Sequence, residues 1–210
     1  MNFDRLRGLY VITDDLLTPP STILEQVTLA LEGGAKIVQL RDKESSLDAI
    51  KKTALKLETL CQEYGAVFVL NDKVELAIEL GLSGLHIGKS DHHRVKEIRK
   101  DFTGYLGVSC YGDVSFAKEM QDIGVDYVAF GSFFTSPTKP NSNIVDLAVL
   151  TLAKKQLNIP VCAIGGIDEE TMSQVMKHKP EMVSLVSSIW KCKDIKSQSK
   201  IFSKWYEESI

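Results

Sequence analysis

The stretch AVFVLNDKVELAIELGLSGLHI, residues 66–87, decides the fold. It begins and ends with short apolar runs of strand length, Ala66–Leu70 and Gly84–Ile87. Between them Lys73–Leu80 carries apolar residues at helical spacing, and Gly81 follows where a helix C-terminus is expected. A strand, a helix and a second strand in this order indicate a βαβ unit with parallel strands.

The same alternation extends over the whole chain. Further apolar runs of strand character are Gly8–Thr13, Lys36–Arg41, Tyr105–Ser109, Asp126–Phe130, Pro160–Ile164 and Met182–Val186. Segments of helical period are Ser21–Glu32, Leu47–Tyr64, Val114–Ile123, Val145–Leu157 and Glu169–His178, and Gly33, Gly65 and Gly124 also stand at helix ends. Eight such units predict a closed (β/α)8 barrel, because a doubly wound sheet of this length usually stops at five or six strands.

Composition favours one globular domain over residues 1–210. Hydrophobic residues make up 44% of the chain, which excludes a disordered protein, and 25 Lys+Arg against 28 Asp+Glu argue against a nucleic-acid partner. No apolar stretch approaches the ~18 residues of a membrane span, and the first residues, MNFDRLRG, lack a signal-peptide core. We therefore expect a cytoplasmic protein with no membrane partner; a homo-oligomer stays open. The tail Asp194–Ile210 is predicted as a final packing helix with Ile201, Phe202, Trp205 and Tyr206 on its apolar face.

Neither the cysteines nor the histidines have metal-ligand spacing. Cys61, Cys110, Cys162 and Cys192 are far apart, so we expect reduced thiols, with Cys162 in the core and Cys110 either in the core or at the edge of a site. Among the histidines we expect His86 to be a hydrogen-bonded core or barrel-lining residue, His92 and His93 to begin a surface helix, and His178 to lie at a charged helix end.

Polar residues follow most of the predicted strands, where barrel enzymes carry their chemistry. Strand period places Gln39, Arg41 and Lys43 on one face, so we predict that all three point into the barrel mouth. Two cations there suit a phosphorylated ligand. The alternative is an internal ion pair from Arg41 to a carboxylate such as Asp14 or Asp72.

Two aspartates and a glycine pair complete the predicted mouth. Asp72 and Asp91 end neighbouring strands and suit Mg²⁺ bound together with substrate phosphates, although either residue could instead cap a helix. Gly165-Gly166 and Val186-Ser187 follow the last two strands, where barrels commonly bind phosphate.

Taken together, these segments resemble the thiamine phosphate synthase family. The matching motifs are Tyr10–Asp14, Val38–Lys43, Leu70–Asp72, Gly84–Gly88 with Asp91, Gly107–Tyr111, Asp126–Gly131, Pro137–Pro140, Ala163–Ile167 and Val183–Ser187. The resemblance implies a barrel enzyme that uses Mg²⁺ to join a pyrimidine methyl diphosphate to a thiazole phosphate, releasing diphosphate.

The resemblance also implies roles for individual residues. Gln39, Leu40, Arg41, Asp42 and Lys43 would bind the pyrimidine diphosphate, with Asn71 at the ring and Ser109 and Lys139 at the diphosphate. Ser136, Pro137, Thr138, Gly166, Val186 and Ser187 would bind the thiazole phosphate, and Asp72 and Asp91 would bind Mg²⁺. Arg41, Lys43 and Lys139 are the candidate catalytic cations, since they would stabilise charge on the departing diphosphate. The loop Ser132–Pro140 is expected to act as a lid.

Two departures and two alternatives accompany the resemblance. Lys89 stands where the family usually has Gln, and Ser136 where it usually has Thr. A related thiazole tautomerase carries a His at the position of Tyr111, and a non-catalytic phosphate-binding protein is the other alternative. The sequence leaves open whether the thiazole is carboxylated.

Overall fold

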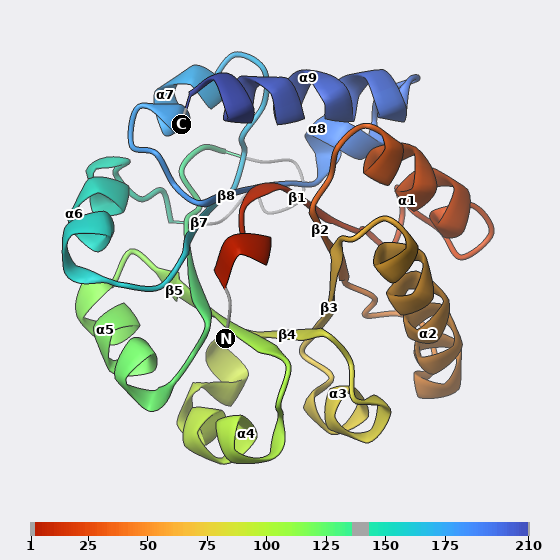
Figure 1. Ribbon diagram of the computed structural model, residues 1–210, viewed down its shortest axis with the longest axis horizontal. Helices are drawn as coiled ribbons and strands as arrows, with labels where there is room; N and C mark the ends of the chain where they lie inside the picture. The colour runs from red at the N-terminus through yellow and green to blue at the C-terminus, as the bar shows by residue number, and fades with distance from the viewer. Residues whose placement is uncertain (1–2, 136–142, 210) are drawn as a thin grey trace.

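The eight predicted strands close into a parallel barrel in chain order (Figure 1), in a computed structural model that describes residues 3–135 and 143–209. The strands are β1 Gly8–Ile12, β2 Ile37–Leu40, β3 Val67–Asn71, β4 Gly84–Ile87, β5 Tyr105–Tyr111, β6 Tyr127–Phe130, β7 Val161–Ile164 and β8 Met182–Leu185. The pairing of β1 with β8 completes the ring. The prediction of a (β/α)8 barrel is confirmed.

Helices surround the barrel on all sides (Figure 1). They are α1 Ile23–Glu32, α2 Leu47–Glu63, α3 Val74–Leu80, α4 Val95–Asp101, α5 Val114–Ile123, α6 Ala148–Gln156, α7 Met172–Met176, α8 Ser187–Trp190 and α9 Ile195–Glu208, with 3₁₀ turns η1 Phe3–Arg5 and η2 Lys89–Arg94. Within the described ranges no helix is both long and apolar enough to cross a bilayer.

Alternation along the strands separates two buried layers. One apolar cluster fills the space between strands and helices and includes Val38, Leu40 and Phe68. A smaller cluster fills the barrel interior and includes Tyr10, Ile37 and Tyr127. Neighbouring positions of one strand therefore serve different layers, as strand period requires.

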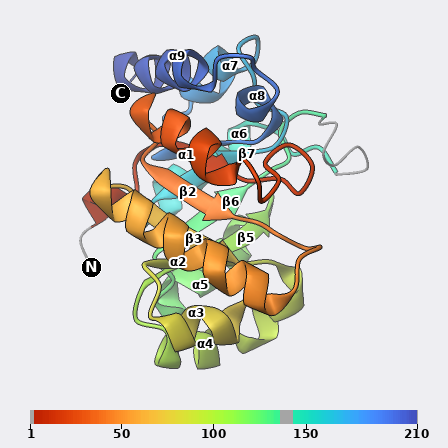
Figure 2. The same cartoon turned by 90° about the vertical axis from the view of Figure 1, so that its right-hand side faces the viewer.

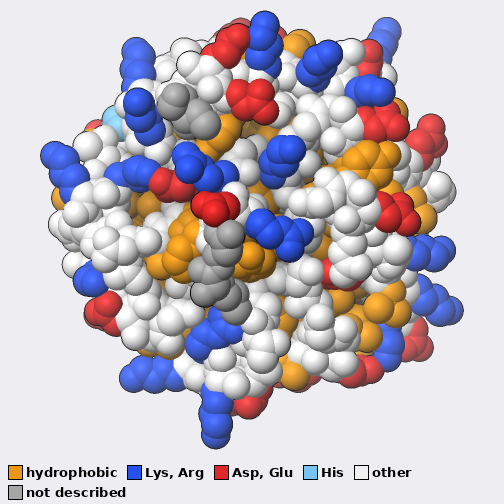
Figure 3. Space-filling view, in the orientation of Figure 1, with side chains coloured by type: hydrophobic (Ala, Val, Ile, Leu, Met, Phe, Trp, Pro, Cys, Tyr) orange, Lys and Arg blue, Asp and Glu red, His pale blue; other side chains and the backbone are white. Residues whose placement is uncertain are grey.

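The two ends of the barrel differ. Figure 2 shows η1 and the described start of the chain at the end from which the strands run. Figure 3 shows this amino-terminal face, where hydrophobic side chains gather near the centre and charged side chains lie around them. The carboxyl ends of all eight strands lie at the opposite end.

Several local predictions need correction. The predicted helix Glu169–His178 is only α7, and the short α8 had no predicted helical segment, whereas α4 follows the helix start expected at His92 and His93. Gly33 caps α1 as predicted, with φ −81°, while the left-handed conformation belongs to Gly34, with φ 102°. Gly33 instead permits close packing, because a Cβ atom there would lie 2.5 Å from the Lys196 backbone oxygen on α9. On α9 itself Phe202 and Tyr206 are buried as predicted, whereas Ile201 is exposed.

Candidate functional site

A cavity of about 680 Å³ opens at the carboxyl end of the barrel. Every strand contributes to its wall, through Ile12, Gln39, Asn71, His86, Ser109, Ala129, Ile164 and Ser184. This volume lies in the usual range for small-molecule sites. The cavity floor is the top layer of barrel-facing side chains, so the closure of the barrel itself builds the site.

Polar side chains cross the barrel directly beneath this cavity. Gln39 Nε2 donates to the Tyr10 hydroxyl (2.5 Å), which lies 2.9 Å from the Tyr127 hydroxyl. The Tyr127 hydroxyl lies 2.9 Å from Nδ1 of His86, whose Nε2 lies 2.8 Å from Ser109 Oγ. His86 was expected to be a hydrogen-bonded core or barrel-lining residue, and it is hydrogen-bonded and lines the barrel. Burial raises the pKa of Tyr10 and Tyr127 well above the ordinary phenol value, so both stay neutral.

The Ser184 hydroxyl faces the same cavity. Ser184 lies on β8 opposite Tyr10 of β1 and is 2% exposed, and its Oγ has no partner among the described residues. A buried hydroxyl with an unused hydrogen bond is uncommon and has a free-energy cost. Nothing in the sequence distinguished Ser184 from the apolar run around it.

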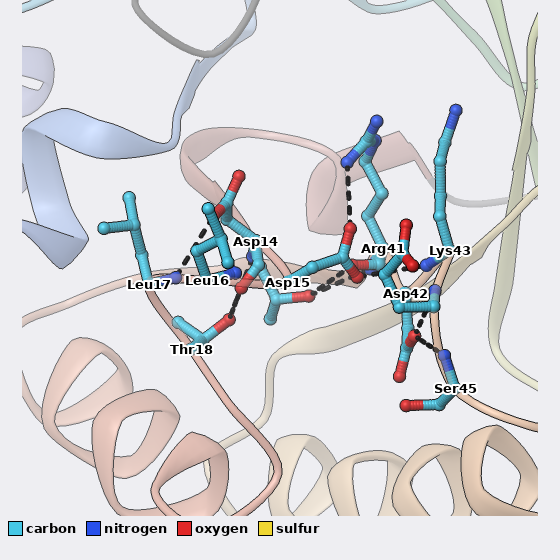
Figure 4. Close-up of polar contacts among 11 residues, drawn as sticks. Asp14, Asp15, Leu16, Leu17, Thr18, Arg41, Asp42, Lys43 and Ser45 are labelled. Carbon is cyan, nitrogen blue, oxygen red and sulfur yellow. Dashed lines mark hydrogen bonds and ion pairs between the residues drawn. The ribbon is translucent and has the colours of Figure 1, made fainter.

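The cationic side of the mouth lies in the loops after β1 and β2 (Figure 4). Arg41 lines the cavity, and its Nη1 lies 3.8 Å from Asp15 Oδ2. The Asp15 carboxylate also accepts a hydrogen bond from the Lys43 backbone N–H (3.0 Å). The alternative of an ion pair to Arg41 is therefore confirmed in kind, but its partner is Asp15 and not Asp14 or Asp72.

Lys43 lies differently from the prediction. Strand β2 ends at Leu40, so strand period does not continue to Lys43, which is exposed and contributes nothing to the cavity wall. Its side chain nevertheless extends in the same direction as that of Arg41 (Figure 4). Of the other residues in this segment, Leu40 packs in the outer apolar layer, and Asp42 accepts hydrogen bonds from the backbone of the following turn.

The two candidate metal ligands follow β3 and β4. Asp72 has φ 61° and caps no helix, so the capping alternative is wrong for this residue. Its carboxylate makes no hydrogen bond or ion pair to the described residues and lies near Gly88, 3.8 Å from where a Cβ atom there would stand. Asp91, three residues after Gly88 in η2, accepts a hydrogen bond from Ser90 Oγ (2.8 Å) and lies 3.6 Å from Arg94 Nη1.

These two carboxylates fit a hard divalent cation, which commonly takes one or two protein carboxylates and fills its other positions with phosphate and water. Among the described residues no group of three or more His, Cys, Asp or Glu side chains has metal-binding geometry. Neither Asp72 nor Asp91 contributes to the cavity wall, so a cation held by them would lie at its rim.

The glycine pair and the end of β8 close the other side of the cavity. Gly165, Gly166, Val186 and Ser187 all line it, with φ 105° at Gly165 and 67° at Gly166. A Cβ atom on Gly166 would lie 2.5 Å from the Phe134 backbone oxygen, so both the conformation and the space at this position require glycine. The predicted residues Ser136, Pro137, Thr138 and Lys139, and most of the predicted lid, lie outside the described residues.

Some cavity residues were missed from the sequence. His92 was expected on the surface, but it lines the cavity and stacks on Phe116, with ring centroids 4.5 Å apart. Burial lowers its pKa, and its Nε2 has no hydrogen-bond partner in the described part of the chain. Lys89, which stands where the family usually has Gln, lies at the cavity wall although it is exposed. The cysteines are free thiols, and Cys110 is both buried and at the cavity wall.

Fold and cavity together define a (β/α)8-barrel enzyme with its site at the carboxyl ends of the strands. Residues 9–189 match the family model for thiamine monophosphate synthase, and the chain belongs to that family. The homologues that carry this activity are transferases.

Individual relatives agree over nearly the full length. The thiamine-phosphate synthase of Wolinella succinogenes is 40% identical over 187 residues, which cover 89% of this chain and 86% of the relative. That of Thioalkalivibrio sulfidiphilus is 35% identical over 206 residues, 97% of each chain. Among solved structures, thiamine phosphate pyrophosphorylase from Pyrococcus furiosus superposes with a TM-score of 0.88 at 30% identity and covers 100% of both chains.

Proposed function

We propose that this protein is a Mg²⁺-dependent thiamine phosphate synthase that joins a 4-amino-2-methylpyrimidine methyl diphosphate to the nitrogen of a thiazole phosphate and releases diphosphate. The observation that carries this proposal is the convergence of Gln39, Arg41, Asn71 and Ser109 with the Gly165-Gly166 loop around one cavity. These are groups for a polar heteroaromatic ring and for phosphate oxygens, and the family relationship supplies the reaction.

The protein residues act by binding and by electrostatics. The Arg41 guanidinium faces the cavity and would neutralise charge that grows on the departing diphosphate. Asn71 and Gln39 would hold the aminopyrimidine, whose electron-rich ring stabilises the methylene cation that the thiazole nitrogen captures. Gly166 and Ser187 would hold the thiazole phosphate on the opposite wall. No protein nucleophile takes part, and holding the two substrates together in one cavity accounts for much of the expected rate.

Asp72 and Asp91 would hold Mg²⁺ at the rim, where the cation's charge, when bound, offsets that of the diphosphate. Lys43 would reach the diphosphate from the exposed loop after β2. Lys139 is proposed as a third cation, and Ser136, Pro137 and Thr138 as thiazole phosphate contacts, on the resemblance alone. A cytoplasmic location and a homo-oligomer stay predictions.

A coupling assay tests the function directly. The purified chain is incubated with Mg²⁺, isotope-labelled pyrimidine methyl diphosphate and either the plain or the carboxylated thiazole phosphate. We expect labelled thiamine phosphate and one equivalent of diphosphate, and the better thiazole identifies the preferred substrate. The Arg41→Met variant should lose most of this activity, whereas Lys52→Met, an exposed cation on α2, should retain it. If the native chain forms no thiamine phosphate with either thiazole, the proposed function is wrong.

A further inference from the structure

The hydrogen-bonded chain beneath the cavity joins two parts of the site that do not touch each other. In order, its members are Gln39 on β2, Tyr10 on β1, Tyr127 on β6, His86 on β4 and Ser109 on β5, with consecutive polar atoms 2.5–2.9 Å apart. Gln39, His86 and Ser109 line the cavity, whereas Tyr10 and Tyr127 do not and belong to the buried interior of the barrel. Both ends of the hydrogen-bonded chain are therefore available to ligands, and the two phenols, Tyr10 and Tyr127, are not.

Each phenol in the chain carries a single hydrogen. Tyr10 has two hydrogen-bond partners among the described residues, Gln39 and Tyr127, and both lie within hydrogen-bond distance of its oxygen. For its own hydrogen to be bonded as well, Tyr10 must donate to one partner and accept from the other, and the same holds for Tyr127 between Tyr10 and His86. A neutral imidazole likewise carries its hydrogen on one nitrogen and accepts at the other. When every hydrogen of these buried groups is bonded in this way, all the bonds point in the same direction along the chain.

Only two directions satisfy every member. In the first, Gln39 Nε2 donates to Tyr10, as in the structure, and each following group donates to the next until His86 donates to Ser109. The Gln39 carbonyl oxygen is then free to accept from a ligand, and the Ser109 hydroxyl is free to donate to one. In the second, the Gln39 amide is turned over, so that Gln39 offers a donor to the ligand while the Ser109 hydrogen is bound to His86.

We propose that this chain couples recognition of the pyrimidine ring at Gln39 to hydrogen-bond donation from Ser109 to the diphosphate, so that an amino-substituted ring and an anion favour the same direction. The inference rests on the proposed function, which supplies both ligands. A ring with an amino donor at Gln39 selects the first direction, in which Ser109 can donate to a phosphate oxygen. An oxo-substituted ring accepts at Gln39 and selects the second, in which Ser109 cannot donate.

Equilibrium binding measures this coupling without turnover. Isothermal calorimetry follows 4-amino-5-hydroxymethyl-2-methylpyrimidine and its 4-oxo analogue, each with and without saturating inorganic diphosphate and Mg²⁺. For each ring, the coupling factor is the dissociation constant measured without diphosphate and Mg²⁺ divided by the dissociation constant measured with them. In the native chain we expect the coupling factor of the amino ring to exceed that of the oxo ring by about tenfold or more, because the mismatched direction leaves one buried hydrogen bond unmade.

Substitutions of the two phenols in the hydrogen-bonded chain change groups that contact neither ligand. Tyr127→Phe should bring the two coupling factors to within about twofold of each other, and Tyr10→Phe, which breaks the chain at an independent point, should do the same. Tyr206→Phe is the matched control, since it removes a buried tyrosine hydroxyl that donates to the Glu181 backbone oxygen (2.6 Å) and takes no part in the Gln39–Ser109 chain. This variant should keep the native difference. Thermal melting verifies that each variant is folded, and the comparison of the two rings in the native chain needs no variant.

The outcomes separate the two proposals. Equal coupling factors for the two rings in the native chain, or a native difference that persists in folded Tyr127→Phe and Tyr10→Phe, would overturn the coupling and leave the synthase function standing. If neither ring nor diphosphate binds, the proposed function and the coupling fail together.

Discussion

Gly107 and Tyr127 are paired across β5 and β6, and a Cβ atom on Gly107 would lie 2.0 Å from Cζ of the Tyr127 ring. The missing side chain on β5 thus makes the space in which the Tyr127 ring lies. From that position the Tyr127 hydroxyl reaches both Tyr10 and His86. A glycine in one strand therefore determines where a polar group of the neighbouring strand can be placed.

Gly107→Ala should displace the Tyr127 ring and break its hydrogen bonds. We expect the free energy of unfolding to fall by about 1–3 kcal/mol, the usual effect of overpacking a core. Denaturant titration measures the change. Gly88→Ala is the control, because its φ of −103° suits alanine and a Cβ atom there would meet only an ordinary contact at 3.8 Å. Equal stability of Gly107→Ala and the native chain would show that the ring does not need this space.

The Arg99–Asp126 ion pair joins α4 to the start of β6. Arg99 Nη1 lies 2.7 Å from Asp126 Oδ2, and the two side chains are 16% and 8% exposed. Asp126 also accepts a hydrogen bond from the Leu106 backbone N–H (2.8 Å). Burial nevertheless raises the pKa of Asp126 above its ordinary value, against the opposing effects of that hydrogen bond and of Arg99. The folded state thus holds the Asp126 proton more tightly than the unfolded state does.

Arg99→Met should destabilise the protein in a pH-dependent way. Without the cation the pKa of Asp126 rises further, and its ionised form is buried unpaired, which costs about 3–5 kcal/mol near neutral pH. Because a raised pKa favours the folded state at low pH and this contribution is lost as the pH rises through it, the deficit should shrink toward about pH 4. Denaturant titrations at both pH values test this. Lys118→Met, which breaks an exposed pair with Asp122, should change stability by less than about 1 kcal/mol at either pH.

The barrel could be predicted because each strand is a continuous apolar run. Strand β4 and helix α5 begin and end at the predicted residues, Gly84–Ile87 and Val114–Ile123. A parallel strand is buried on both faces, so its sequence differs sharply from the amphipathic helices around it. A continuous apolar run does not, however, show which residues of a strand face the barrel interior and which face the helices.

The hydrogen-bonded chain from Gln39 to Ser109 could not be predicted, because an apolar run does not show which of its residues face the barrel interior. Tyr10 and Tyr127 stand inside apolar runs 117 positions apart, and only the closed barrel brings their hydroxyls together. Lys43 was misplaced because strand period was extended past Leu40, where β2 ends. Asp15 was missed as the partner of Arg41 because the loop after β1, and not a strand, positions it.

Asp91→Asn should raise the Mg²⁺ concentration that gives half-maximal synthase activity. Loss of one of two carboxylate ligands weakens cation binding, and we expect an effect of about tenfold or more. Initial rates across a Mg²⁺ titration provide the measurement. Asp101→Asn is the matched control, since Asp101 is exposed at the end of α4. Unchanged rates at limiting Mg²⁺ would show that Asp91 is no ligand.

Asp15 ties the loop after β1 to the loop after β2, because its carboxylate accepts from the Lys43 N–H and faces Arg41. An asparagine keeps the acceptor oxygen but loses the charge, whereas an alanine loses both. Since the ion pair is long, at 3.8 Å, and 22% exposed on each side, its charge should contribute less than about 1 kcal/mol to stability. We therefore expect Asp15→Asn to keep the KM for the pyrimidine diphosphate within about twofold, and Asp15→Ala to raise it about fivefold or more by releasing the loop that carries Arg41. Steady-state kinetics of both variants provide the measurement, and Asp48→Ala, at an exposed position on α2, is the control. If KM rises equally in Asp15→Asn and Asp15→Ala, the charge of Asp15, and not its hydrogen bond to Lys43, positions Arg41.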